Sequence, residues 1–227
     1  MKKAVILLSG GLDSSTCLAY AHAAQYSCYA LSFDYGQKQR AELTAAQRIA
    51  TDFSVQQHHV MPLALQQWGG SALNDETLEV PCHHESTDVP ITYVPARNTI
   101  ILSMALGWSE VIKADAIFIG VSSVDYSGYP DCRPEYMQAF EAMANRATKR
   151  ALDGHPIAIC TPLMHLSKSE TIHLGLTLGV DYTKTVSCYR ADDEGLACGE
   201  CSSCYYRKNG FLNAGVADLT RYAESRG

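Results

Sequence analysis

The residues with the clearest chemical potential lie near the start of the chain, where a glycine pair is surrounded by hydroxyl and carboxyl side chains. In chain order they are Ser9, Gly10, Gly11, Leu12, Asp13, Ser14 and Ser15. Glycines let the backbone turn sharply and bring its amides close to an anion, and serines add hydroxyl donors. A helix that begins here adds positive partial charge at its N-terminus. The segment therefore predicts a phosphate-binding loop; the simpler alternative is a glycine turn with a serine or aspartate helix cap.

This loop differs from two other nucleotide-binding patterns. It has neither the Gly-Lys-Ser/Thr order of nucleotide hydrolases nor the three spaced glycines of dinucleotide-binding folds. Because it lacks the lysine that reaches the terminal phosphates, cleavage of the γ-phosphate is not the expected reaction.

Four of the nine cysteines are grouped near the C-terminus in the pattern C-x9-C-x2-C-x2-C. They are Cys188, Cys198, Cys201 and Cys204. Four thiolates can fill a tetrahedral site and leave no position for a substrate, which predicts one structural zinc ion per chain. An iron–sulfur cluster is the main alternative, although position 208 is lysine and the ferredoxin continuation is missing; unligated thiols are the third.

Further candidates follow other apolar runs. Phe33 and Tyr35 come at the end of one run, where a nucleotide would lie across a sheet. Arg97 opens a helical segment and could bind a phosphate or carboxylate with two hydrogen bonds. Lys168 follows the last apolar run and could neutralise developing phosphate charge. For Arg97, the plainer interpretation is a surface arginine at a helix entry that begins with proline. For Lys168, it is a surface lysine at the start of a helix.

The elements that must position these residues alternate between short apolar runs and helical patterns. Strands are expected at 3–8, 28–33, 55–61, 116–121 and 156–160, and helices at 14–25, 38–53, 98–114, 134–152 and 168–178. This alternation predicts an α/β fold with a doubly wound parallel sheet and helices on both faces. Ligands then bind beyond the carboxyl ends of the strands, where the candidates fall. Segment 62–93 lacks periodicity and is expected to be an irregular excursion or lid.

Composition narrows the class of partner. The 18 basic and 24 acidic residues give a formal charge of -6, which lowers the expectation of a nucleic-acid partner. The N-terminal apolar run breaks at Ser9 without a cleavage site, and no apolar stretch approaches the roughly 20 residues of a membrane span. We therefore expect a cytoplasmic protein without a membrane partner.

The first loop resembles the SGGxDS signature of the PP-loop ATP pyrophosphatases, which hold the pyrophosphate released when an adenylate forms. The motifs VPARN at 94–98 and YPDCRPE at 129–135, together with the cysteine group, resemble the 7-cyano-7-deazaguanine synthase family of queuosine biosynthesis. The resemblance spans residues 9–204. It implies a PP-loop nucleotide-binding domain over 1–180, with a zinc-binding appendage at 181–227 packed on it. It also allows a homodimer.

The resemblance implies a carbon–nitrogen ligase that converts 7-carboxy-7-deazaguanine, ammonia and ATP with Mg2+ to the nitrile through an adenylated acid and an adenylated amide. AMP and pyrophosphate are released. Lys168, Arg97 and Asp13 would be catalytic; the nucleotide would contact the phosphate loop, with Leu8 before it, and Phe33 and Tyr35.

The loop 120–135 is rich in glycine, aromatic and carboxylate residues, which suits a flat polar ring. The substrate candidates are Arg97, Asp125, Tyr129, Asp131, Cys132 and Arg133. Asp131 is predicted to accept hydrogen bonds from the purine-like edge. Cys132 is given a packing or ring-contact role because no base is evident beside it.

Three other functions are compatible with parts of the pattern. A PP-loop tRNA thiolase would need a basic RNA surface, which the acidic composition disfavours. Another adenylating amide ligase would share the phosphate loop. A non-enzymatic zinc-bearing interaction module is disfavoured by the intact loop.

Overall fold

The computed structural model describes residues 1–86, 88–122 and 128–223. Five strands form one parallel sheet in the order β3-β2-β1-β4-β5. The strands are β1 (Lys3–Leu7), β2 (Ser27–Asp34), β3 (Gln57–Pro62), β4 (Ala116–Phe118) and β5 (Ala158–Cys160). All five coincide with the apolar runs of the sequence, and the predicted doubly wound α/β fold is confirmed.

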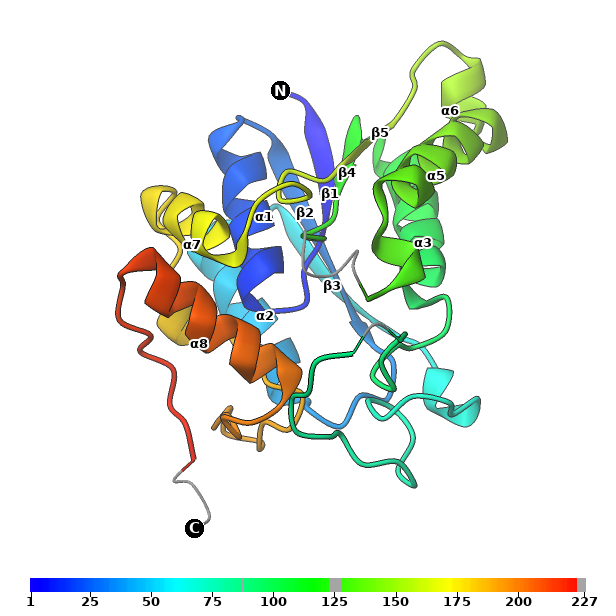
Figure 1. Cartoon of the computed structure of the whole chain (residues 1–227). Coiled ribbons are helices and arrows are strands. Elements are labelled where there is room, and N and C mark those ends of the chain that lie inside the picture. The colour runs from blue at the N-terminus through cyan, green and yellow to red at the C-terminus, as the bar shows by residue number, and fades with distance from the viewer. Residues whose placement is uncertain (87, 123–127, 224–227) are drawn as a thin grey trace.

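Helices cover both faces of this sheet (Figure 1). The α-helices are α1 (Leu12–Ala23), α2 (Ala41–Asp52), α3 (Arg97–Ile112), α5 (Pro134–Ala147), α6 (Lys149–Leu152), α7 (Lys168–Thr177) and α8 (Ser202–Ala214). The described residues also form the 3-10 helices η1 (Leu65–Gln67), η2 (Pro130–Cys132) and η3 (Tyr182–Lys184). The first two α-helices lie on one face with α7 and α8 outside α1, and α3 and α5 lie on the other.

Strand β1 shows how the sequence creates the two layers. Successive side chains of a strand point to opposite faces. Val5 and Leu7 belong to the core shared with α3 and α5, whereas Ala4 and Ile6 belong to the core shared with α1 and α2. A strand that is buried on both faces must be apolar throughout, which explains the uninterrupted run in the sequence.

The strand order places a topological switch between β1 and β4. From β1 the chain builds outward through β2 and β3, and it then returns to the other side of β1 for β4 and β5. A crevice opens beyond the carboxyl ends of the strands at such a switch. The predicted phosphate loop follows β1, and Gly120 follows β4, so both face this crevice.

The observed helices differ from the predicted ones at two places. The helix expected at 134–152 is divided, because Thr148 is extended with φ -108° and ψ 139° and separates α5 from α6. Helix α8 was not predicted within the cysteine-bearing segment, and it packs along α7. Gly210 permits this contact, since a Cβ there would lie 3.0 Å from Ile172 Cδ1 and collide with the stem of Lys168. Beyond Pro62, which ends β3, the described residues of segment 62–93 are irregular apart from η1, as expected. Among the helices of the described residues, none is long and apolar enough to cross a bilayer.

Candidate active site

A cavity of about 240 Å³ opens at the switch point between β1 and β4. The predicted site residues that line it are Leu8, Ser9, Gly11, Leu12, Asp13, Ser14, Phe33, Tyr35, Arg97, Tyr129, Asp131 and Cys132. Helix α3, the phosphate loop, the end of β2 and segment 129–132 thus meet around one space. Most of the side chains singled out in the sequence are therefore neighbours in the structure.

The phosphate loop presents the start of α1 to this cavity. Gly11, the N-cap of α1, has no side chain to form a capping hydrogen bond, and the Leu12 N–H donates instead to Ser187 Oγ at 3.1 Å. The hydroxyls of Ser9 and Ser14 lie 3.0 Å apart, and the Ser9 N–H donates to Ser14 Oγ at 3.2 Å. Ser15 is buried and donates to Gly11 O at 2.7 Å, so it braces the turn from behind. Amides and hydroxyls gathered at a helix N-terminus form a ready site for phosphate oxygens.

Two glycines allow the loop to lie this close to its neighbours. Gly10 has a φ of +88°, and a Cβ at that position would lie 2.6 Å from Ala46 N and collide with Glu42 O. Gly10 does not line the cavity; it packs the loop against α2. A Cβ at Gly120 would lie 2.9 Å from Asp13 O. The backbone after β4 therefore closes directly over the start of α1.

Asp13 and Lys168 form an ion pair beside the loop. Lys168 Nζ lies 2.7 Å and 2.9 Å from the two carboxylate oxygens of Asp13. The Lys168 side chain is 14% exposed and the Asp13 side chain 25%, so water screens the pair only partly. Asp13 lines the cavity and Lys168 stands behind it at the first position of α7. The carboxylate thereby holds the ammonium next to the phosphate loop.

Arg97 projects into the cavity without an ion-pair partner among the described residues. Its guanidinium donates to the Tyr35 hydroxyl at 3.4 Å and lies 5.6 Å from the centre of the Tyr35 ring. Burial raises the pKa of Tyr35 to about 12, so the phenol remains neutral. An unpaired guanidinium in a partly dry cavity is suited to binding an anionic group.

Asp131 is already engaged by the protein. Its Oδ2 accepts from the Asn98 N–H at 3.0 Å, so this carboxylate caps the start of α3. The Asn98 amide donates in return to Asp131 O at 3.1 Å and to Cys132 Sγ at 3.1 Å. Asn98 thus ties both residues of the predicted substrate loop to α3. Cys132 is buried and lines the cavity, which is compatible with the packing role expected for it.

The remaining predicted substrate residues differ in their placement. The Tyr129 hydroxyl lies 2.9 Å from Thr92 Oγ1, and its ring stacks near Tyr93 with centroids 6.1 Å apart. Arg133 is exposed as the N-cap of α5 and does not line the cavity. Asp125 lies outside the described residues. Segment 62–93 contributes Leu73, Thr92 and Tyr93 to the cavity wall.

Glu42 was missed in the sequence, although it lines the same cavity from the first turn of α2. Its Oε1 accepts from Gln37 Nε2 at 2.9 Å, and burial raises the pKa of its carboxyl from 4.5 to about 7. An acidic residue in the first turn of the helix after the second strand was the available signal. The α/β rule on ligand position would have directed attention to it.

The raised pKa of Glu42 predicts a pH-dependent cost in stability. Because the folded pKa of about 7 exceeds the unfolded value of 4.5, the protonated carboxyl stabilises the fold below 4.5, and this contribution is lost as pH rises through 7. Glu42→Gln removes the titration. In urea unfolding, we compare the free energy of unfolding of the variant with that of wild type. We expect this difference to rise by about 2–3 kcal/mol in favour of the variant as the pH increases from about 5 to about 8.5, at 1.36 kcal/mol per pKa unit. A stability difference that is the same at both pH values would contradict this account.

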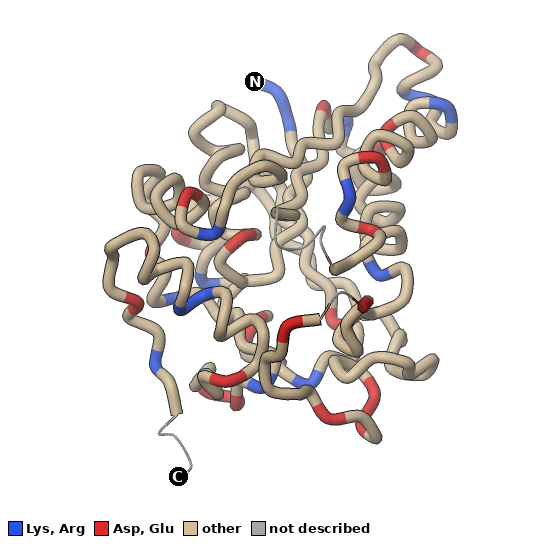
Figure 2. Tube along the Cα trace, in the orientation of Figure 1, with Lys and Arg blue, Asp and Glu red and all other residues tan. Residues whose placement is uncertain are grey.

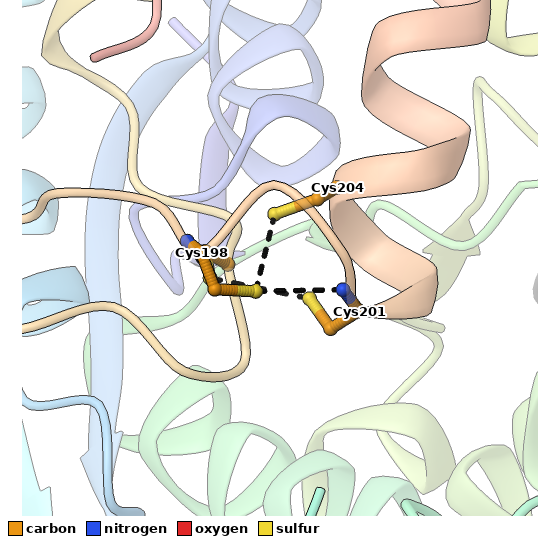
Figure 3. Close-up of side chains that lie close together, drawn as sticks. Cys198, Cys201 and Cys204 are labelled. Atoms are coloured by element: carbon orange, nitrogen blue, oxygen red, sulfur yellow. Dashed lines mark hydrogen bonds between the residues drawn. The ribbon is translucent and has the colours of Figure 1, made fainter. Parts of the chain in front are cut away.

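The four grouped cysteines converge at the start of α8, where Figure 3 shows Cys198, Cys201 and Cys204 close together; Cys188 joins them from the chain after η3. Their sulfur atoms all lie within 4.8 Å of one another, and Cys188–Cys201 and Cys198–Cys204 are separated by 3.9 Å and 4.0 Å. Backbone N–H groups of Arg190 and Cys198 point at Cys188 Sγ from 3.3 Å and 3.2 Å. Such donors favour thiolate sulfur, and the cluster could hold a metal ion.

The chain directly before Cys188 forms part of the active-site wall. The Val186 N–H donates to Gly10 O at 3.0 Å, and Ser187 Oγ accepts from the Leu12 N–H at 3.1 Å. The buried Arg207 of α8 supports this stretch by donating to Thr185 Oγ1 at 2.8 Å. Ser187 was missed because its position depends on a fold-back of the chain that no local pattern indicates. The cysteine centre therefore holds one wall of the phosphate loop.

The sheet order and this cavity define an α/β fold with a ligand site at its topological switch point. A solved NMN synthetase structure from Francisella tularensis shares the fold with a TM-score of 0.52 at 16% identity, covering 96% of this chain and 79% of that one. The profile described as "Queuosine biosynthesis protein QueC" matches residues 3–215. The chain belongs to this family.

Curated relatives agree with this assignment. A Coxiella burnetii protein named 7-cyano-7-deazaguanine synthase is 62% identical over 222 residues, covering 98% of each chain. A Pseudomonas fluorescens protein of the same name is 59% identical over 221 residues, covering 97% of this chain and 98% of that one. The predicted family and the predicted class of enzyme, an ATP-dependent ligase, are confirmed.

Proposed function

We propose that this chain converts 7-carboxy-7-deazaguanine, ammonia and ATP to 7-cyano-7-deazaguanine, releasing AMP and pyrophosphate. The observation that carries the proposal is the meeting of the phosphate loop and the unpaired Arg97 in one cavity. The loop suits the departing pyrophosphate, and Arg97 suits the carboxylate that attacks the α-phosphate. The names of the relatives supply the identity of the product. The acid is the one that the family resemblance implies.

The reaction proceeds through two activations. The carboxylate oxygen attacks the α-phosphate of ATP, which gives an acyl-adenylate and pyrophosphate. Ammonia then forms a C–N bond and AMP leaves, giving the amide. The amide oxygen attacks a second ATP in the same way, and elimination of AMP with loss of both nitrogen protons gives the nitrile. Each activation converts a poor leaving oxygen into AMP, so one phosphate site serves both steps.

The residues around the cavity divide these tasks. The N-terminus of α1 with Ser9 and Ser14 would receive the pyrophosphate, and Lys168, now held by Asp13, would neutralise charge that develops on the phosphates. Mg2+ bound with ATP would add Lewis-acid stabilisation of the same charge. Oδ2 of Asp131 caps α3, which leaves Oδ1 to accept from the purine-like edge. Phe33 and Tyr35 offer apolar and aromatic surface to the nucleotide.

The metal we propose for the cysteine centre is zinc. A tetrahedral zinc ion with bonds of about 2.3 Å separates its sulfur ligands by about 3.8 Å. The distances of 3.9 Å and 4.0 Å fit this arrangement, whereas an iron–sulfur cubane needs more room between its cysteines. Four thiolates leave no open position, so the ion would have a structural role.

The partners proposed are small molecules. Lysine and arginine positions are interspersed with aspartate and glutamate positions in Figure 2, which gives an anionic nucleic acid little to bind. Because thiolate ligands persist in reducing compartments, we propose that the reaction takes place in the cytoplasm.

The proposal is tested by incubating the purified protein with 7-carboxy-7-deazaguanine, ammonium, Mg2+ and ATP. We expect mass spectrometry to detect the nitrile together with two molecules of AMP for each molecule of product. ADP as the nucleotide product, or a thiolated product in the presence of a sulfur donor and tRNA, would overturn it.

A further inference from the structure

Glu42 is fixed to the phosphate loop by close backbone contact. Its carbonyl oxygen lies where a side chain on Gly10 would have to be, so the first turn of α2 sits directly against the loop. The Glu42 side chain lines the cavity from this position. A carboxylate at this point faces the place where phosphate groups would leave, which is unfavourable for binding ATP alone. Its presence there needs a chemical reason.

A buried glutamine sets the direction of the Glu42 carboxyl group. Gln37 is 2% exposed, and its Oε1 accepts from the Tyr35 N–H at 2.8 Å. Its Nε2 donates to Phe33 O at 3.1 Å and to Glu42 Oε1 at 2.9 Å. Because the carbonyl end of the amide is fixed by an N–H donor, the amide cannot flip, and Glu42 receives a neutral donor. The carboxyl group is oriented without being neutralised.

The cavity thus contains two opposite charges that form no direct ion pair, although the Arg97 guanidinium opposes the rise that burial causes in the pKa of the Glu42 carboxyl. Within the described part of the chain, neither Glu42 nor Arg97 forms an ion pair. The titratable groups facing Glu42 are Arg97 from α3 and the Tyr35 phenol. Burial raises the pKa of the Glu42 carboxyl to about 7, close to the value at which a general base works best at neutral pH. The proposed reaction has one anionic acid and one cationic co-substrate, ammonium.

We infer that Glu42 binds the ammonium ion and accepts the proton that converts it to the attacking ammonia. This role rests on the proposed amidation. The N–H bond of ammonium breaks, its proton joins the Glu42 carboxylate, and the nitrogen keeps the electron pair. That pair forms the C–N bond to the acyl carbon, the C–O bond to AMP breaks, and AMP leaves with its electrons. The second proton lost by nitrogen and the proton held by Glu42 pass to water.

Glu42 acts in the amidation and in neither of the two activations. Adenylation of the acid needs no ammonium, and dehydration of the amide needs none either. Glu42→Gln keeps the size of the side chain and an oxygen that can accept from Gln37, but it removes the base. We therefore expect nitrile formation from the acid and ammonium at about pH 7 to fall by about 10²–10⁴-fold, the usual contribution of a general base. Acid-dependent ATP–pyrophosphate exchange and conversion of the amide to the nitrile should stay within about threefold of wild type.

Two further measurements sharpen the test. Hydroxylamine, which is neutral at this pH, should form the hydroxamate equally well with Glu42→Gln and wild type, and alkaline pH should restore amidation by the variant. Glu76→Gln, an exposed glutamate outside the cavity, is the matched control and should match wild type in every assay. Loss of exchange in Glu42→Gln, or unchanged amidation, would overturn the inference. Absence of acid-dependent exchange in wild type would instead refute the proposed function.

Discussion

Replacement of Lys168 by methionine is expected to lower the rate of AMP formation by about 10²–10³-fold, the usual effect of losing one group that stabilises transition-state charge. The ammonium lies 2.7 Å from Asp13 beside the phosphate loop, and methionine keeps the aliphatic stem that packs on Gly210. Removing the charge also leaves Asp13 unpaired next to the phosphates, which adds repulsion. The loss should fall on kcat more than on the KM for ATP, because charge increases as pyrophosphate departs.

Lys149→Met provides the control. Lys149 is on α6 with its side chain 87% exposed and a 3.9 Å contact to Asp153, so its loss should leave the rate unchanged. Lys168→Met should also lower the stability of the fold, because it leaves the partly buried Asp13 carboxylate without its partner. The double variant Asp13→Asn with Lys168→Met should recover part of that stability, since it removes the unpaired carboxylate. If Lys168→Met retains a kcat within threefold of wild type, Lys168 does not act on the phosphates.

Cys201→Ser is expected to remove the metal, to abolish activity and to lower the stability of the fold. Loss of a structural metal is among the few single changes that cost about 4 kcal/mol or more. At about 2–4 °C per kcal/mol for a chain of this size, Tm should fall by about 8–16 °C. Activity should be lost as well, because Val186 and Ser187 hold the phosphate loop through hydrogen bonds of 3.0 Å and 3.1 Å directly before Cys188.

The measurements are metal content, thermal unfolding and AMP formation on the same preparations. A chelator should reproduce the loss in wild type and have no further effect on Cys201→Ser. Cys160→Ser, at a partly exposed cysteine of β5 outside the cluster, should keep one zinc ion per chain. Full metal occupancy in Cys201→Ser, or iron with sulfide in wild type, would contradict the zinc assignment.

The centre of the sheet is predictable because β1 and β4 are buried on both faces and appear in the sequence as short apolar runs, at 3–8 and 116–121. The edge strand β3 is mostly exposed and gives a weaker signal. Helix ends are less predictable where a single residue decides them. Thr148 lies in a helical pattern but is extended, and this divides α5 from α6. Helix α8 has only a weak apolar face, since Gly210 and Phe211 are buried while Leu212 is exposed. Its partner is α7, and that contact is not visible in a local pattern.

The site residues also divide into those that a local sequence pattern indicates and those that depend on contacts across the fold. The phosphate loop and the cysteine group are recognisable because neighbours in sequence do the chemistry together. Glu42 and Ser187 depend on contacts across the fold, through Gln37 for the first and through the Leu12 N–H for the second. The pairing of Lys168 with Asp13 spans 155 positions and is equally invisible in the sequence. Arg133 shares its motif with Asp131, yet helix geometry turns it to the exposed N-cap of α5.

The transfer of a carboxylate oxygen to AMP is the most direct test of the central claim. The acid should be prepared with heavy oxygen in both carboxylate positions and converted with unlabelled ATP, and AMP and nitrile should be analysed by mass spectrometry. If the acid and then the amide attack the α-phosphate held at the N-terminus of α1, each AMP will carry one heavy oxygen. Unlabelled AMP, or label in inorganic phosphate, would show that the phosphate loop does not support adenylation of this substrate.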